Sequence, residues 1–256
     1  MELQYKRGNA LKTIIAYLVI FNIISIFISL LIAYIYKGLG MNLKDNNTYY
    51  AASSLINFAV YVVLFSTLWF INKKDLILEV KEIKTQKDHI VLKILAAYGI
   101  FYAINIVGNS LISNIEYYAD FANNVLGKHT EITSTANNQT TIVEILGGSG
   151  FITMFLAAGI LGPICEEIVF RKAFFDLFKK KELALVFSSF CFALIHITSS
   201  FGSFNLLSIV LMTLPYLFSG VAFGYIYIKN DCKLFVPTAV HMLSNIVSMV
   251  MIVAMG

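Results

Sequence analysis

The chain has few charged residues: Asp, Glu, Lys and Arg make up only 13% of its 256 residues. A soluble globular chain carries about 25% charged and about 45–50% apolar residues, whereas this chain is 58% hydrophobic. This composition excludes a disordered chain and a nucleic-acid-binding domain, and it argues against a soluble enzyme.

Cysteine is also scarce. The three cysteines, Cys165, Cys191 and Cys232, show no CxxC spacing, so no disulfide framework is expected. The chain also lacks internal repeats and low-complexity tracts. Its first apolar run is too long for a cleaved signal peptide and has no small-residue cleavage pattern after it.

In place of charged residues, the chain contains several long apolar runs. A membrane-spanning helix needs about 20 mostly apolar residues, because the hydrocarbon core is about 30 Å thick. We therefore expect an all-α, polytopic transmembrane helix bundle of seven spans, or eight if the stretch 143–178 is broken in two. The seven runs are 13–36, 50–71, 91–113, 143–165, 183–200, 204–228 and 234–255.

The Lys and Arg residues predict the orientation of these spans. With the N-terminus in the cytoplasm, 16 of the 19 basic residues lie in inner segments, as the positive-inside rule requires. Only Lys37, Lys44 and Lys128 then lie outside. We expect a multi-pass protein of a bacterial cell membrane, with the C-terminus outside, the lipid bilayer as a partner and no nucleic acid as one.

Ionisable side chains within apolar runs are the candidates for function, because a charge at membrane depth costs about 2.5–3.5 kcal/mol. Glu166 and Glu167 are adjacent in such a run, and they point about 100° apart on a helix, so they cannot do the same job. Glu167 is placed one turn before Arg171, whose guanidinium we expect to extend to the inner interface. The alternative is a helix end with both acids among lipid headgroups.

Two histidines lie in two further runs. His196 follows Phe192 by four residues, and Asn245 follows His241 by four, so each pair shares a helix face. Taken singly, either histidine is explained by a hydrogen bond between helices, and Phe192 by ordinary core packing. Polar residues on three separate spans together favour a functional site.

Small residues and one proline bear on the packing of these spans. Gly220 and Gly224 form a GxxxG pattern, which permits close helix approach and is explained by packing. Pro163 should kink its helix one turn before the glutamates and leave carbonyl groups unpaired.

These residues form a known pattern. The chain resembles the CPBP family of intramembrane proteases, which includes CAAX prenyl endopeptidases and many bacteriocin-immunity proteins. The motifs EExxxR, FxxxH and HxxxN occur in register between residues 166 and 245, with a partial glycine motif between the last two. Two positions depart from the family pattern: Lys172 stands where many members have Gly, and Leu217 where Phe is common. The matching residues are Glu166, Glu167, Arg171, Phe192, His196, Gly220, Gly224, His241 and Asn245.

The resemblance implies hydrolysis of a peptide bond within the membrane, in a membrane-associated, prenylated or peptide substrate. Such hydrolysis needs an activated water, a donor to the oxyanion and an acid for the leaving amine. Glu166 is the candidate general base, and His196 would hold the water or pass its proton to the leaving nitrogen. His241 and Asn245 would donate to the oxyanion. Supporting roles fall to Glu167, Arg171 and Phe192.

The resemblance also bears on cofactors. No HExxH sequence is present, and the family implies a metal-free glutamate mechanism, which we favour. The alternative is a zinc site built from Glu166, His196 and His241, which supply two nitrogens and one oxygen.

Chain organisation follows from the position of the motifs. Residues 1–140 should hold the N-terminal transmembrane helices, a cytoplasmic linker and an outer loop, and residues 141–256 the CPBP-type catalytic bundle. The linker, 73–90, reads as a helix on anionic lipid or a solvated connection. Loop 114–142 should lie outside. Alternative functions are a non-catalytic bacteriocin-immunity or regulatory protein and, last, a transporter, for which no inverted repeat is evident.

Overall fold

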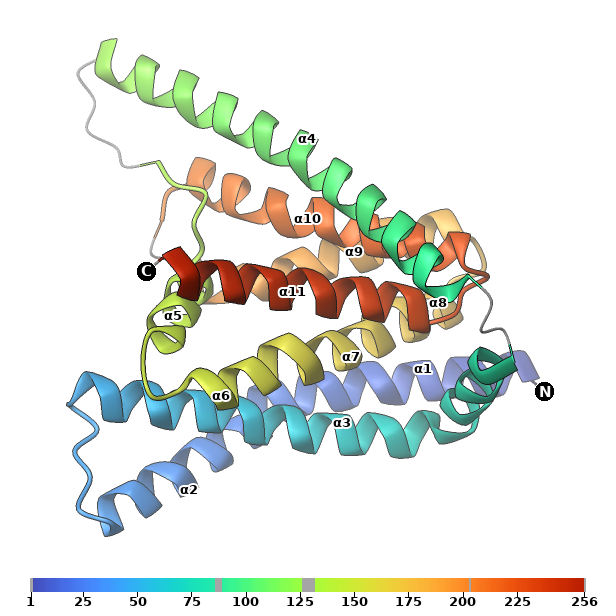
Figure 1. Cartoon of the computed structure of the whole chain (residues 1–256), viewed down its shortest axis with the longest axis horizontal. Coiled ribbons are helices and arrows are strands. Elements are labelled where there is room, and N and C mark those ends of the chain that lie inside the picture. Colours follow the sequence, from blue (N-terminus) through green and yellow to red (C-terminus); the bar gives the residue numbers. More distant parts are fainter. Residues whose placement is uncertain (1, 86–88, 126–131, 203, 256) are drawn as a thin grey trace.

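The computed structural model describes residues 2–85, 89–125, 132–202 and 204–255, and every regular element in these ranges is a helix. Seven helices are long and apolar enough to cross a membrane, which confirms the predicted all-α bundle of seven spans. In Figure 1 the two termini lie at opposite ends of the bundle, as an odd number of crossings requires.

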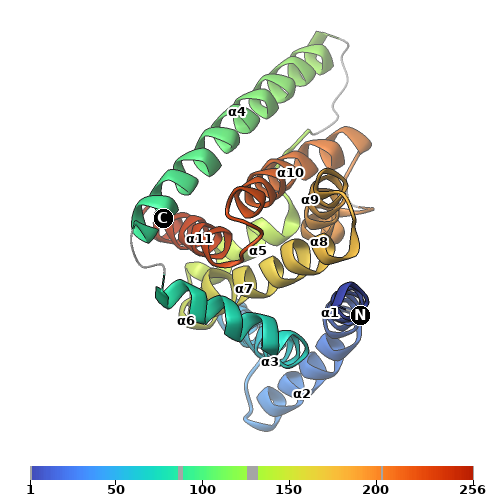
Figure 2. The same cartoon turned by 90° about the vertical axis from the view of Figure 1, so that its right-hand side faces the viewer.

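The N-terminal half supplies three of the seven spans. The first combines α1 (Glu2–Val19), a π-helical turn (Ile20–Ile24) and α2 (Ser25–Gly38). The second is α3 (Asn46–Thr85) and the third is α4 (Ile90–Val125). Both Figure 1 and Figure 2 show α2 and the far part of α4 diverging from the other helices.

The C-terminal half supplies the other four. Helix α5 (Asn137–Leu146) has only 10 residues and cannot span a bilayer. The fourth span is one continuous helix made of α6 (Phe151–Met154), a π segment (Phe155–Leu161), α7 (Gly162–Glu167), a second π segment (Ile168–Ala173) and α8 (Phe174–Leu177). The last three are α9 (Lys181–Ile197), α10 (Leu206–Lys229) and α11 (Phe235–Met255), with a short 3-10 turn (Thr198–Ser200) after α9.

The predicted start of the fourth run is therefore wrong, whereas its expected continuation as helix to Phe178 is confirmed to within one residue. The run 143–165 was expected to begin within what is α5, but the turn at residues 147–150 separates α5 from the spanning helix, which continues to Leu177. The stretch 143–178 is indeed broken, but its first piece is too short to make an eighth span.

The two polar connections are largely helical. Helix α3 continues to Thr85, so most of the 73–90 linker extends a spanning helix. Helix α4 similarly continues to Val125, within the predicted loop 114–142. Residues 86–88 and 126–131 lie outside the described part. Where the chain resumes, Thr133 donates its backbone N–H to Ser208 Oγ, and Asn137 donates to Ser200 Oγ, so this segment is bound to the ends of α9 and α10.

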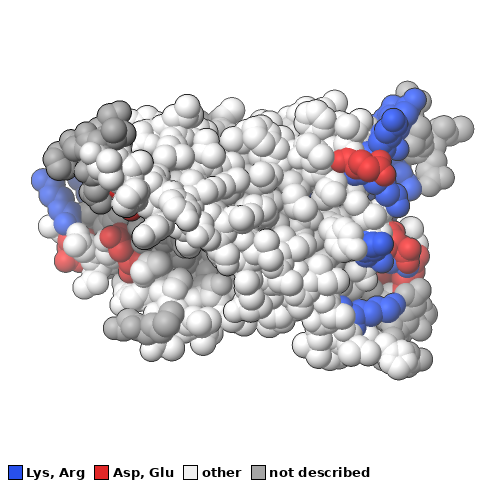
Figure 3. All heavy atoms as spheres, turned by 90° about the horizontal axis from the view of Figure 1, so that it is seen from above, with Lys and Arg blue, Asp and Glu red and all other residues white. Residues whose placement is uncertain are grey.

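Figure 3 shows how charge is distributed on one face of the molecule. Lys, Arg, Asp and Glu side chains gather at the two ends, and the broad surface between them is uncharged. The end that holds the N-terminus is the more heavily charged of the two. An uncharged belt is the surface that the hydrocarbon of a bilayer requires, because lipid tails cannot solvate charge.

The fourth span occupies the centre of the bundle. Figure 2 looks along the bundle from the N-terminal end and shows α7 between the α1–α3 pair and the group α9–α11. Helices α3 and α11 both pack on α7, while α1 and α9 pack on the π segment that follows it. The main hydrophobic core accordingly combines residues of both halves, among them Leu64 and Leu68 of α3 and Phe192 and Phe223 of α9 and α10. The division at residue 140 stays a prediction.

Gly220 permits the close packing of α9 and α10. A Cβ at this position would lie 3.0 Å from Ser189 Cα and 3.2 Å from its carbonyl oxygen. The two helices therefore approach at backbone contact. At Gly224 a Cβ would meet the end of the Leu185 side chain. The GxxxG pattern thus has the packing role that was expected of it.

Candidate active site

The two glutamates of α7 are buried at the centre of the bundle, with Glu166 6% and Glu167 0% exposed. Glu166 Oε1 accepts a hydrogen bond of 3.1 Å from Tyr61 Oη of α3. Glu167 Oε2 lies 3.2 Å from Arg171 Nε. The two carboxylates have different neighbours, as their 100° separation predicts. The alternative of a helix end in the headgroups is wrong, because the helix continues ten residues further.

Two histidines converge on the second oxygen of Glu166. His241 Nε2 of α11 lies 3.7 Å from Glu166 Oε2, and His196 Nε2 of α9 lies 3.9 Å from the same atom. These separations are too long for direct hydrogen bonds, but they suit a water molecule that bridges Glu166 Oε2 to either imidazole. Three motif residues that are far apart in the sequence thus surround one point.

The other ring nitrogens fix the orientation of both histidines. His196 Nδ1 lies 2.7 Å from the Phe192 carbonyl oxygen, and His241 Nδ1 lies 3.0 Å from Glu167 Oε1. A carbonyl and a carboxylate only accept hydrogen bonds, so both Nδ1 atoms carry the proton when the rings are neutral. Both Nε2 lone pairs then face Glu166.

Arg171 does not extend to the inner interface, and that expectation is wrong. Its side chain is 0% exposed. The guanidinium carbon lies 5.4 Å from the centre of the Phe192 ring and 5.9 Å from that of Phe223, within range of cation–π attraction. Glu167 contacts Arg171 with one oxygen and His241 with the other, and the orienting role of this pair stays a prediction.

Aromatic rings cover the histidines. Phe192 is 2% exposed and contacts both His196 and His241, so it is a core residue and a site residue at once. Phe223 stacks on His241 at 4.2 Å, and Tyr216 stacks on His196 at 4.5 Å, both measured between ring centres.

Sequence reasoning missed three of these neighbours: Tyr61, Tyr216 and Phe223. The last two lie on the helix of the glycine pattern, where proximity to Gly220 and Gly224 was a usable signal. Tyr61 lies among several aromatic residues of the second run, and nothing in its spacing distinguishes it.

Asn245 contacts the proline-containing turn of the fourth span. Gly162 donates its N–H to the carbonyl of Ala157, five residues earlier. In the same register the next residue, Pro163, would donate to the carbonyl of Ala158. Proline has no N–H, so it cannot make this hydrogen bond. Asn245 Nδ2 fills this place with a hydrogen bond of 2.8 Å to the Ala158 carbonyl oxygen. The carbonyl that the proline leaves unpaired is thereby satisfied, and the second N–H of the amide remains for another acceptor.

The zinc alternative gains no support from the side-chain geometry. Within the ranges that the structure describes, no group of three or more His, Cys, Asp and Glu side chains is arranged to hold a metal ion. The donor types of Glu166, His196 and His241 suit zinc, but their spacing does not form such a group.

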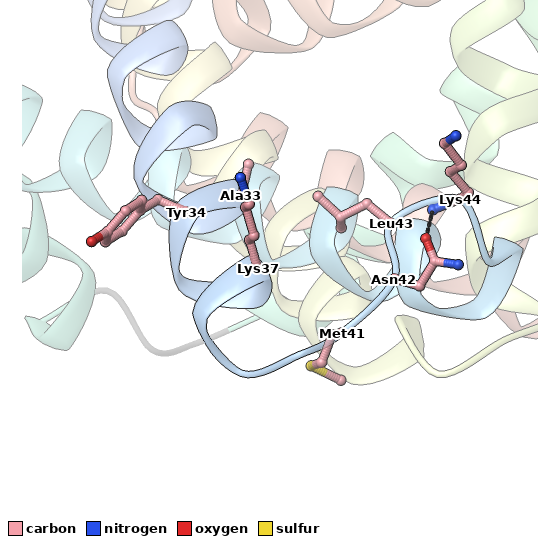
Figure 4. Close-up of a pocket in the computed structure, with 7 residues that line it drawn as sticks. All are labelled: Ala33, Tyr34, Lys37, Met41, Asn42, Leu43 and Lys44. Atoms are coloured by element: carbon pink, nitrogen blue, oxygen red, sulfur yellow. Dashed lines mark hydrogen bonds between the residues drawn. The ribbon is translucent and has the colours of Figure 1, made fainter.

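A cavity of about 540 Å³ lies elsewhere, at the connection between α2 and α3. Figure 4 shows the residues that line it, among them Lys37 and Lys44. None of the site residues lines this cavity, so it does not serve the site on α7.

Comparison with known proteins is consistent with this site. The model of the family described as type II CAAX prenyl endopeptidase, Rce1-like, matches residues 148–247, which contain all three motifs. No solved structure matches the chain significantly.

Three curated relatives align with larger parts of the chain. The UPF0177 protein YxdF of Lactococcus lactis is 29% identical over 52% of this chain and 66% of its own. The candidate membrane peptidase YdiL of Bacillus subtilis is 29% identical over 62% of this chain and 57% of its own. An uncharacterised protein of Mycoplasma capricolum is 26% identical over 83% of this chain and 59% of its own.

The chain thus spans about two thirds or less of the length of these relatives. The motifs, the buried polar residues on three helices and the family match agree with one another. The chain is a multi-pass membrane protein, and its residues 148–247 match the model of the Rce1-like family of type II CAAX prenyl endopeptidases, the CPBP family that the motifs predict.

Proposed function

We propose that this protein is an intramembrane endopeptidase that hydrolyses a peptide bond with a water activated by Glu166. The observation that carries the proposal is the convergence of His196 Nε2 and His241 Nε2 on Glu166 Oε2, at 3.9 and 3.7 Å. A buried carboxylate beside two oriented imidazoles provides the base and the proton carriers that amide hydrolysis needs. The family match and the name of the Bacillus subtilis relative support the same reaction class.

The proposed reaction has two stages. In the first, Glu166 takes a proton from the water as the water oxygen bonds to the carbonyl carbon, and the carbonyl electron pair moves to oxygen as an oxyanion. In the second, that proton passes through His196 to the amide nitrogen. The carbon–nitrogen bond then breaks as the oxyanion closes to a carboxylic acid, the amine leaves, and Glu166 is again a carboxylate.

His241 and Asn245 are the proposed oxyanion donors. Because Glu167 accepts the Nδ1 proton of His241, Nε2 can donate only from an imidazolium that already carries both protons before the water attacks, so His241 takes no proton from the reaction. Glu167 stabilises that cation, as a carboxylate does for a catalytic imidazolium. Asn245 contributes the amide hydrogen that Ala158 does not use. Together they would stabilise the negative oxygen of the first stage.

The substrate class is proposed from the family. A peptide bond close to a prenylated cysteine, or in another membrane-associated peptide, would reach a site that lies within the bilayer. The proposed mechanism uses the Glu166 carboxylate, the histidine nitrogens and a water molecule, and it needs no metal. The alternative is a zinc ion held by Glu166, His196 and His241. Elemental analysis of the purified protein for zinc distinguishes the two.

Mass spectrometry of cellular peptides tests the proposal. Cells with the wild-type protein should contain cleavage products that are absent with Glu166→Gln, while both proteins insert equally into the membrane. Glu144→Gln is the control, since Glu144 is a solvent-exposed carboxylate that accepts a hydrogen bond from Tyr50 and lies away from the active site. Identical peptides from wild type and Glu166→Gln would overturn the assignment of the base. Protection against a bacteriocin that survives in Glu166→Gln would favour the non-catalytic alternative.

A further inference from the structure

The oxygens of Glu166 have separate partners. Oε2 faces the two histidine Nε2 atoms, whereas Oε1 accepts the hydrogen bond of Tyr61. The terminal torsion of a glutamate side chain has a broad, roughly two-fold preference, so α7 alone does not determine which way the carboxylate plane points. The Tyr61 hydroxyl fixes one oxygen and thereby aims the other at the histidines.

The position of Tyr61 is built into the packing of three elements. A Cβ at Gly162 would lie 3.3 Å from Tyr61 Cζ and 3.4 Å from Oη, closer than most Cβ contacts. Gly162 stands one turn before Glu166. Because glycine has no side chain, it leaves room for the Tyr61 phenol to reach the Glu166 carboxylate. On another side, Phe21 packs edge-on against the Tyr61 ring at 5.4 Å between centres. The hydroxyl is therefore held in one place.

Tyr61 belongs to α3, which lies outside the region 148–247 that the family model matches. We propose that Tyr61 is a positioning residue of the active site, which holds Glu166 Oε1 so that Oε2 faces the two histidines. The N-terminal helices then complete the site, and the motif-bearing helices by themselves leave the base unoriented. This inference rests on the proposed role of Glu166 as the general base.

Tyr61→Phe removes the hydroxyl and keeps the ring against Gly162 and Phe21. Tyr50→Phe is the matched control, because Tyr50 lies on the same helix and donates a 2.9 Å hydrogen bond to another carboxylate, Glu144 Oε2. Both variants lose one tyrosine–glutamate hydrogen bond, but only one of them touches the site.

The first measurement is cleavage of an internally quenched peptide with a farnesylated cysteine three residues from its C-terminus. We expect Tyr61→Phe to lower kcat about 10- to 100-fold, as the loss of a hydrogen bond to a charged group predicts. KM should change less than about twofold, since the proposed role of Tyr61 is to hold Glu166 and not to bind substrate. Tyr50→Phe should match wild type. A Tyr61→Phe protein with wild-type kcat overturns the proposal.

The second measurement does not depend on turnover. Infrared difference spectroscopy during a pH titration gives the carboxyl band of Glu166, assigned by its loss in Glu166→Gln. We expect this band to shift to higher frequency in Tyr61→Phe and to stay in place in Tyr50→Phe. An unshifted band in Tyr61→Phe refutes the contact itself. A shifted band in Tyr61→Phe, together with identical cellular peptides from wild type and Glu166→Gln, refutes the proposed role of Glu166 as the base and leaves the contact standing.

Discussion

The buried pair of Glu167 and Arg171 yields the sharpest stability prediction. Both side chains are 0% exposed, and Arg171 Nε lies 3.2 Å from Glu167 Oε2. Arg171→Met keeps most of the apolar stem but leaves the Glu167 carboxylate without its cation. Breaking a buried pair in this way costs about 3–5 kcal/mol. His241 Nδ1 still contacts the carboxylate at 3.0 Å, so we expect a loss near the lower limit, about 3 kcal/mol.

The double variant separates the lost charge from lost packing. Arg171→Met combined with Glu167→Gln removes both charges, and Arg171 Nη2 has no hydrogen-bond partner among the described residues even in the native pair. Replacement of a whole buried pair is often close to neutral. We therefore expect the double variant to be more stable than Arg171→Met alone, by more than half of the single variant's loss.

The assay is equilibrium unfolding of the purified protein in mild detergent by titration with dodecyl sulfate, followed by far-ultraviolet circular dichroism. Lys233→Met is the control, because its 2.7 Å pair with Glu82 is solvent-exposed and exposed pairs contribute little. Its midpoint should equal that of wild type. Wild-type stability in Arg171→Met, or a double variant no better than the single one, would refute the reasoning that an unpaired buried carboxylate sets the cost.

Three further predictions follow from the packing and the topology. Asn245→Ala should cost about 1–3 kcal/mol in the same unfolding assay, because the Ala158 carbonyl oxygen loses its donor; unchanged stability would leave only the oxyanion role for this amide. Gly220→Ala should destabilise by about 1–3 kcal/mol, since the new methyl group meets the backbone of Ser189. Gly224→Ala should cost less, since only the flexible end of a leucine side chain must move; equal losses would contradict this account. Finally, reporter fusions should place the N-terminus in the cytoplasm and the C-terminus outside, and a common side for both would contradict seven crossings.

The charged linker shows where sequence reasoning stopped short. Residues 73–90 suggested a helix on lipid or a solvated connection, but three acids of the α3 extension, Asp75, Glu79 and Glu82, contact other helices and their connections. Asp75 Oδ2 lies 2.6 Å from Lys172 Nζ, and Glu79 Oε2 accepts the backbone N–H of Leu234 at 2.9 Å, just before α11. Charge alternation is the same whether a partner is water, lipid or protein, so the pattern could not distinguish them.

Lys172 illustrates the same limit. As a departure from the family pattern it suggested nothing about function, yet the structure shows its ammonium group between Asp75 and Asp176, and only 8% of its side chain is exposed. The residue thus connects the extension of α3 to the helix that carries the glutamates. The partner that makes this possible lies 97 positions away in the sequence, and no short motif records it.

The sequence by itself determined the seven spans, the charge asymmetry between the two ends and the residues of the three motifs. These properties follow from the thickness of a bilayer and the period of a helix, and both can be read within about 20 consecutive residues. Only the tertiary structure decided that Arg171 is buried, that both histidines direct Nε2 toward Glu166 and that Tyr61 binds its other oxygen. Each of these depends on which helices lie against α7, and such contacts join residues separated by whole spans: 105 positions separate Tyr61 from Glu166, and 74 separate Glu167 from His241.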